Sequence, residues 1–220
     1  MSRTRKPDKS APSHAADGTQ AATRRHRRSL ETRVRLFRTA IALFARHGFS
    51  SVTVEDITHA ADVGKGTFFN YFETKDHVLG VIAELQISKI KEAADRANAG
   101  DESVRSILHD LAFRLIEEPG QSQELARAVV SSFLASKVVR DLLEENTSVG
   151  RATIAEIVAM GQKRGEIDPD LKKKTVALQF QQAVMGTILL WSLYGKPDLS
   201  RWIETSYQHF WRAIAAQTRK

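Results

Sequence analysis

The stretch that decides the fold is residues 53–75, TVEDITHAADVGKGTFFNYFETK. Its pattern predicts two short helices joined by a tight turn. Thr53 is expected to cap the first helix by accepting a hydrogen bond from the amide of Asp56. Asp62 suits the turn, because Asp is among the few non-glycine residues that enter the left-handed backbone region readily. The second helix is expected over residues 65–72, so the stretch predicts a helix-turn-helix.

The second helix of this pair has two very different faces. Phe68 and Phe72 are four residues apart, so they share one face and are expected to pack under Ile57. The opposite face is a poor solvated surface and a good nucleic-acid surface, since Lys, Thr and Asn bond to base edges or phosphates and a glycine lets a helix lie deep in a groove. The residues predicted to face duplex DNA are Lys65, Gly66, Thr67, Phe69, Asn70 and Tyr71.

A longer pattern surrounds the helix pair. Apolar residues recur every three or four positions from Leu30 to Phe44, which predicts a helix over residues 30–47 that ends at Gly48. Together with the helix pair, a set of apolar, small and aromatic positions runs through residues 33–79: Ala40, Phe44, Gly48, Phe49, Thr53, Ile57, Ala61, Val63, Gly66, Thr67, Phe68, Phe69, Tyr71, Phe72, Lys75 and Leu79.

On these positions, residues 33–79 resemble the DNA-binding domain of the tetracycline-repressor (TetR) family. The resemblance implies an all-helical, homodimeric transcription regulator, most often a repressor, that a small molecule controls. It adds Thr53 and Lys75 to the residues expected to face DNA, with Lys75 meeting a phosphate at the start of the next helix. It also implies that the recognition helix enters the major groove.

Four positions depart from the family pattern. Thr58 stands where Ala is usual, and Asp62 stands where Gly is usual. Gly64 replaces a frequent Ser and is expected to leave the start of the second helix without a side-chain cap. Phe69 replaces Tyr and lacks the phenol that could bond a phosphate. None of these changes argues against the fold.

Composition narrows the class of protein. The 220 residues are 42% hydrophobic and 27% charged, which is ordinary for a globular chain. The absence of cysteine excludes disulfides and thiolate chemistry, and the seven histidines show no metal-ligand spacing on one helix face. No phosphate-binding loop or serine elbow is present, so an enzyme is not expected. We expect no cofactor, no metal, no signal peptide and no apolar run of membrane-spanning length, hence a cytoplasmic protein.

The positive charge is concentrated at the N-terminus. Residues 1–29 hold eight Lys or Arg and two Asp, so they carry +6 of the net charge of +7. Residues 1–28 are expected to be a disordered basic tail that ends in RRHRR at positions 24–28. The tail is either a solvated segment or an arm that contacts phosphates without sequence specificity or enters the minor groove. Residues 31–77, in contrast, hold six basic and six acidic residues, so attraction to DNA must depend on placed contacts.

The remaining chain predicts further helices and a second domain. We divide the chain into residues 1–28, a helix-turn-helix DNA-binding domain over 29–77, and a helical ligand-binding and dimerisation domain over 78–220. About nine helices are expected in all, with no strand pattern. The last two helices are apolar around most of their circumference, so one face can fill the core and another can meet a partner. Together with the resemblance this predicts a homodimer through a four-helix bundle, and the alternative is that these residues only fill the core of a monomer. Two recognition helices would then meet two halves of a pseudo-palindromic operator.

The resemblance implies a pocket for an unknown effector within the C-terminal domain, between the fourth and eighth helices. The candidates are aromatic or polar residues within otherwise apolar helices: His109, Phe113, Phe133, Gln179, Gln182 and Trp191. Two other functions stay open. One is a non-specific or architectural DNA-binding protein that uses the basic tail, and the other is a helical ligand-binding dimer that has lost DNA binding.

Overall fold

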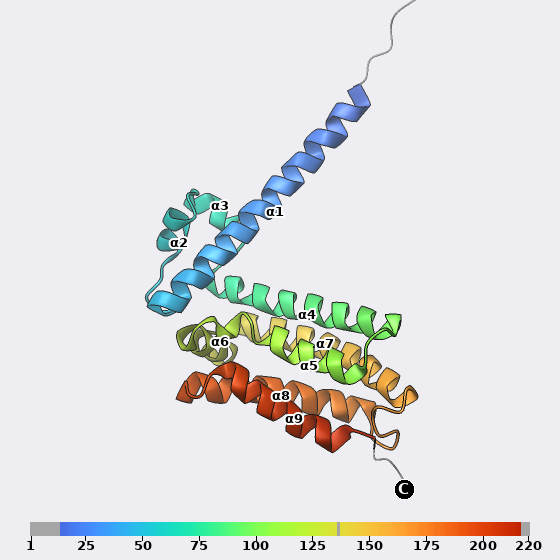
Figure 1. The fold of residues 1–220 in the computed structure, drawn as a ribbon. Helices are drawn as coiled ribbons and strands as arrows, with labels where there is room; N and C mark the ends of the chain where they lie inside the picture. Colours follow the sequence, from blue (N-terminus) through green and yellow to red (C-terminus); the bar gives the residue numbers. More distant parts are fainter. Residues whose placement is uncertain (1–13, 136, 217–220) are drawn as a thin grey trace, which may run out of the picture.

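The structure is a computed structural model that describes residues 14–135 and 137–216, and it is helical throughout these ranges (Figure 1). Nine α-helices and one 3-10 helix follow one another there, and a lone antiparallel bridge joins Ile167 to Ala215. The all-α fold class with about nine helices, predicted from the sequence, is confirmed.

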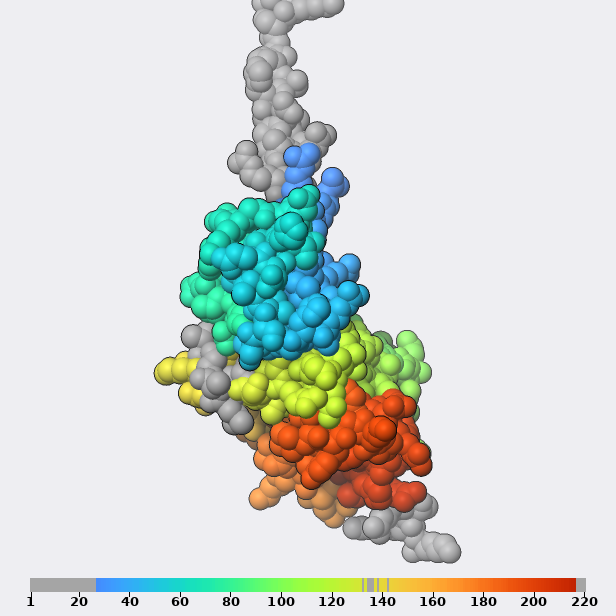
Figure 2. Space-filling view, turned by 90° about the vertical axis from the view of Figure 1, so that its left-hand side faces the viewer, coloured from blue at the N-terminus to red at the C-terminus, as the bar shows by residue number. Residues whose placement is uncertain are grey.

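The N-terminal unit consists of α1 (His14–His47), α2 (Val54–Ala60) and α3 (Lys65–Phe69). It packs on the start of α4 (Lys75–Ala99) and forms one end of the molecule (Figures 1 and 2). Its core contains the aromatic residues expected there, together with two residues from a helix much later in the chain. The buried members are Leu36, Ala40, Ile41, Phe44, Val52, Ile57, Ala61, Phe68, Phe72, Val78, Leu79, Val81, Ile82, Leu125 and Val129.

The C-terminal part lies below α4 (Figure 1). It comprises α5 (Val104–Leu115), the 3-10 helix η1 (Pro119–Gln121), α6 (Gln123–Ala135), α7 (Lys137–Lys163), α8 (Lys173–Tyr194) and α9 (Leu199–Ile214). Its helices run roughly along α4 except α6, which is seen end-on (Figure 1). α4 packs along α7, and α8 lies against α6, α7 and α9. A second hydrophobic core fills the space between these helices. α4 therefore belongs to both cores.

Two adjacent residues at the start of α6 connect the two parts. The Ser122 hydroxyl donates to the carbonyl of Ala45 at the end of α1, at 3.2 Å. The Gln123 amide donates to the carbonyl of Ser192 near the end of α8, at 3.1 Å. α6 is thus hydrogen-bonded to the N-terminal unit on one side and to α8 on the other.

Two helix bounds differ from the sequence predictions. α1 begins at His14, not near Leu30, so residues 14–28, which we expected to be a disordered tail, continue α1 in the structure. This extension is rich in Ala and Arg, which are good helix formers, and adding turns to an existing helix is easier than starting one. Residues 1–13 lie outside the described residues. α3 ends at Phe69, earlier than predicted, because the Tyr71 amide bonds the Phe68 carbonyl and tightens the last turn.

α8 also corrects an expectation about membrane-spanning length. By length and composition alone this helix is long and apolar enough to cross a membrane, with a mean hydropathy of 1.3 over 18 residues. The sequence of α8 contains no uninterrupted apolar run of this length, because Gln and Thr residues interrupt the helix. Its inner face, which includes Phe180, Val184 and Trp191, is buried in the C-terminal core.

Candidate nucleic-acid interface and ligand cavity

The α2–α3 pair is held in shape by its own polar residues. The Thr53 hydroxyl accepts from the amide of Asp56 at 3.1 Å, and the Asp56 carboxylate accepts from the amide of Thr53 at 2.8 Å. The bond from the Thr53 amide, followed by a bond that the Thr53 hydroxyl donates to the same carboxylate at 2.7 Å, lowers the pKa of Asp56. Asp62 has a positive φ of 50°, as its place in the turn requires. Gly64 offers α3 no side-chain cap, as expected from its departure from Ser.

The outward surface of α3 is open to solvent. Gly66, Phe69 and Asn70 are exposed, and nothing approaches the position of a Cβ at Gly66 within 4 Å. Phe69 is 47% exposed, although the neighbouring Phe68 is fully buried. The exposed ring of Phe69 directly precedes the exposed amide of Asn70 in the chain. The polar and aromatic groups of this face are therefore available to a partner.

Two other predicted contact residues, Lys65 and Tyr71, already have partners within the chain. Lys65 forms an ion pair with Glu55, and since both side chains are more than half exposed, another partner replaces it at little cost. The Tyr71 hydroxyl donates to the hydroxyl of Ser29 in α1 at 3.1 Å.

Lys75 has a structural role that the sequence did not reveal. Its ammonium group donates to the carbonyls of Phe49 and Val52, at 2.8 and 3.0 Å, and lies 4.4 Å from the centre of the Phe49 ring. Two of its three N–H bonds are therefore used to hold the connection between α1 and α2 on the start of α4. The contact of Lys75 with a phosphate stays a prediction, and it would use the third N–H bond of the ammonium group.

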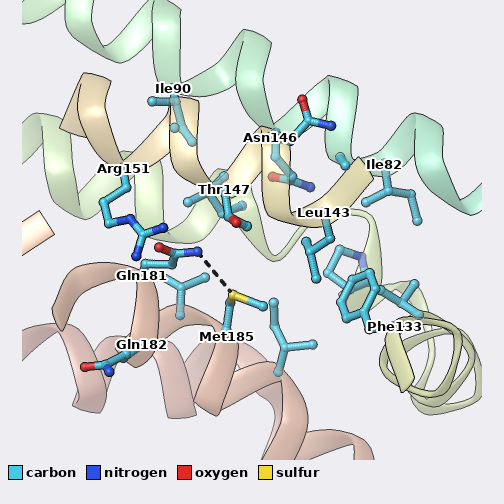
Figure 3. A pocket seen from close by; sticks show the side chains of 18 of the residues that line it. Ile82, Ile90, Phe133, Leu143, Asn146, Thr147, Arg151, Gln181, Gln182 and Met185 are labelled. Carbon is cyan, nitrogen blue, oxygen red and sulfur yellow. Dashed lines mark hydrogen bonds between the residues drawn. The ribbon is translucent and has the colours of Figure 1, made fainter. Parts of the chain in front are cut away.

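A cavity of about 660 Å³ lies between α4, α6, α7 and α8 (Figure 3). This volume is within the range of about 300–1,000 Å³ that small-molecule sites occupy. Most of its lining is aliphatic, from residues such as Ile82, Ile90 and Ile154. Its polar lining residues are Gln86, Asn146, Thr147, Arg151, Gln181 and Gln182.

Two of these polar residues have unsatisfied atoms. The side-chain oxygens of Gln86 and Gln181 are buried and have no hydrogen-bond partner among the residues that the structure describes. The Gln86 amide nitrogen donates to Glu118 at 3.1 Å, and that of Gln181 reaches only the sulfur of Met185, at 3.7 Å. A buried amide oxygen without a partner costs roughly 1–3 kcal/mol, so both atoms are suited to a donor from a bound molecule or water.

The cavity contains two of the six residues predicted for effector binding, Phe133 and Gln182. The other four do not line it, because their side chains are used elsewhere. His109 bonds Glu204 of α9 at 2.7 Å, and its ring also contacts Phe113. Trp191 lies in the C-terminal core, and Gln179 is exposed on α8. The residues that sequence reasoning missed are Gln86, Asn146, Thr147, Arg151 and Gln181.

The cavity and the core of the N-terminal unit share residues. Leu79, Ile82 and Val129 line the cavity and are also buried in that core. An occupant of the cavity would consequently touch side chains on which α1–α3 rest. Within the parts of the chain that are described, no group of three or more His, Asp or Glu residues is placed to hold a metal ion.

Comparison with known proteins agrees with this geometry. Residues 36–82 match the family model described as "Bacterial regulatory proteins, tetR family". The chain is 26% identical over 170 residues to a probable acrEF/envCD operon repressor of Escherichia coli, covering 74% of this chain and 77% of that protein. It is 27% identical over 149 residues to the HTH-type transcriptional repressor DhaR of Mycobacterium sp., covering 65% and 75%.

Solved structures extend the likeness to the C-terminal helices. A Thermus thermophilus FadR, a TetR-family repressor in complex with lauroyl-CoA, matches with a TM-score of 0.60 and 25% identity over 86% of this chain and 96% of that one. The fatty acid degradation regulator FadR of Bacillus halodurans shares the fold, with a TM-score of 0.66 and 19% identity over 82% and 94%.

Proposed function

Because this chain belongs to the tetR family of bacterial regulatory proteins, we propose that it represses transcription as a homodimer whose two α3 helices bind a pseudo-palindromic operator, and that a small molecule in the cavity releases it. It is a ligand-responsive DNA-binding regulator and not an enzyme. The single observation that carries the release mechanism is the sharing of Leu79, Ile82 and Val129 between the cavity and the N-terminal core.

The α3 surface supports sequence-specific contact. In the proposed complex, Thr67 and Asn70 contact base edges, Gly66 permits close approach, and Phe69 packs on the sugar-phosphate backbone. Lys65, Thr53, Tyr71 and Lys75 complete the contact through phosphates. With as many acidic as basic residues in residues 31–77, this surface is not a general polyanion site.

The outer face of α8 supports the dimer. Leu190, Leu193 and Tyr194 are 43%, 61% and 67% exposed, although they lie in a helix whose other face is core. Tyr194 stacks on Trp202 of α9, with ring centres 6.4 Å apart, so the apolar surface continues onto the last helix. In the proposed dimer the α8–α9 pairs of two chains cover each other in a four-helix bundle. Operator half-sites would then be about one turn of DNA apart, ~34–36 Å, or somewhat more.

The position of α4 supports control by a ligand. α4 lines the cavity with Ile82, Gln86 and Ile90, and it holds the N-terminal unit through Lys75 and through Leu79. A molecule that fits the cavity better when α4 is displaced shifts the population toward the geometry that does not bind DNA. The lauroyl-CoA complex of the Thermus relative supports an effector of this kind.

The division of the chain is part of the same proposal. Residues 29–77 form the DNA-binding domain, and residues 78–220 bind the effector and form the dimer. Val78, Leu79, Val81 and Ile82 lie beyond this boundary but are buried in the N-terminal core, and α6 contributes to both cores, so the boundary is a place of coupling and not a flexible linker. A regulator of this type acts in the cytoplasm, where the DNA is.

Asn70→Ala tests the proposed role of α3. We expect the variant to lose discrimination at the base pairs that Asn70 reads, by about 1–3 kcal/mol per half-site, because a bidentate amide contact is removed. Selection of preferred sequences from a random pool, followed by titration of single-base variants, measures the change. Asn98→Ala, at an exposed position far along α4, is the matched control. An unchanged base preference in Asn70→Ala would place base recognition elsewhere.

Removing the basic cluster of α1 tests the alternative of non-specific binding. The cluster is on the part of α1 that projects beyond α2 and α3 (Figure 1). Replacing Arg24, Arg25, Arg27 and Arg28 with Gln removes charge without breaking the helix. We expect weaker binding and a smaller salt dependence, by about 0.9 in the logarithmic slope for each lost phosphate contact, with the same preferred sequence. Complete loss of operator binding would favour the architectural function.

A further inference from the structure

The cavity contains one charged residue, and its charge has no counter-ion. Arg151 of α7 is half-buried, and it is the sole Lys, Arg, Asp or Glu among the residues that line the cavity. Across the described ranges, no hydrogen bond or ion pair of its guanidinium group is found. A guanidinium group partly removed from water and facing aliphatic side chains is unfavourable unless an anion meets it.

The polar residues around Arg151 form one end of the cavity. In Figure 3 the guanidinium of Arg151 points toward the amide of Gln181 on α8, and Thr147 is one turn earlier on α7. The opposite end, near Phe133, Leu143 and Ile82, has no charged residue and is mostly apolar, with the amide of Asn146 as the polar group labelled beside it. The cavity is therefore polarised along its length, with a single cationic end and an extended hydrophobic end.

Gln181 is able to assist an anion. Its amide nitrogen has only a thioether sulfur as a partner, and its oxygen has none among the described residues. Turning the amide by half a revolution presents two N–H donors in place of the oxygen, and little is lost by breaking the contact with sulfur. Arg151 and Gln181 together then provide donors from two helices to one carboxylate.

We propose that the effector of this cavity is an amphipathic monocarboxylate, with its carboxylate on Arg151 and its apolar body extending toward Phe133 and Ile82. This inference rests on the proposed control by a ligand, and it specifies the ligand's chemistry. One cation matches one carboxylate. It does not match the several phosphate charges of an acyl-CoA, the class of molecule bound in the structure of the Thermus relative.

A series of probes with the same twelve-carbon body tests this inference on the full chain. Dodecanoate, 1-dodecanol and dodecylammonium differ in the charge of the head group, and lauroyl-CoA adds phosphates. Isothermal titration below micelle-forming concentrations is expected to show dodecanoate binding at least about tenfold more tightly than each of the other three. Equal affinity along the series, a preference for another member, or no binding of any member would overturn the inference.

Arg151→Gln identifies the residue responsible. We expect dodecanoate affinity to fall to that of 1-dodecanol, with the affinity for 1-dodecanol unchanged. Arg140→Gln, an exposed arginine on the same helix and outside the cavity, is expected to bind both as the wild type does. A preference for dodecanoate that survives in Arg151→Gln would overturn the inference. If dodecanoate binds through Arg151 but leaves operator binding unchanged, the ligand class stands and the proposed release mechanism fails.

Discussion

Leu193→Glu is expected to convert the proposed dimer into monomers and to lower operator affinity by about 10²-fold or more. Leu193 is 61% exposed in the single chain and lies next to Leu190 and Tyr194 on the outer face of α8. In a four-helix bundle this position is buried, where an unpaired carboxylate costs several kcal/mol, on the order of 3–5. A monomer holds one half-site, so it loses the gain of about 10²–10⁴ that linked binding of two half-sites provides.

Light scattering after size-exclusion chromatography measures the mass, and gel-shift titration of a two-site operator measures the affinity. Val149→Glu is a suitable control, because it also places a carboxylate on an exposed apolar residue, 46% exposed, but on α7. We expect this control to remain dimeric and to bind DNA normally. If Leu193→Glu has the mass of a dimer and normal affinity, the outer face of α8 is not the interface.

The helix-turn-helix could be predicted from the sequence because the interactions that fix its helix ends and its turn are between residues close in sequence. The Thr53–Asp56 cap, the left-handed Asp62 and the stop at Gly48 each involve residues within four positions of one another. The predicted start of α1 was wrong because the criterion used, hydrophobicity, does not decide the structure of this segment. Low hydrophobicity in residues 14–28 predicted disorder, whereas helix propensity and continuity with the following turns decide the structure there.

The ligand cavity was largely beyond prediction because it forms where helices distant in sequence separate. Periodicity indicates which side of a helix is buried, but it does not show which neighbours leave a space between them. Arg151 looked like an ordinary charged residue on a solvated helix, and only the packing of α7 on α8 places it in an apolar cavity. Lys75 is similar, since its bonds to Phe49 and Val52 depend on how α4 meets the α1–α2 connection.

Gly150→Val is expected to weaken operator binding in the absence of any effector. Gly150 is buried on α7 at the wall of the cavity, opposite α4. A Cβ atom there would be 2.9 Å from the terminal carbon of Ile90 and 3.3 Å from that of Ile87. A single methyl group displaces only the ends of these flexible side chains, so Gly150→Ala is expected to bind nearly as the wild type does. The larger valine side chain must move α4 itself, at a cost of about 1–3 kcal/mol.

Because α4 holds the N-terminal unit, this displacement imitates the change that we propose for the effector. If the whole free-energy cost of accommodating valine shifts α4 from its DNA-binding position to the displaced one, operator affinity falls by roughly tenfold for each 1.4 kcal/mol. Gly161→Val separates this effect from general overpacking. It is on the same helix and meets Ile167 at 2.7 Å and Val104 at 3.1 Å, neither of which belongs to α4. We expect Gly161→Val to lower the melting temperature without weakening operator binding by the folded protein. A folded Gly150→Val that binds the operator normally would contradict release through displacement of α4, since the strain would then be absorbed without reaching α1–α3.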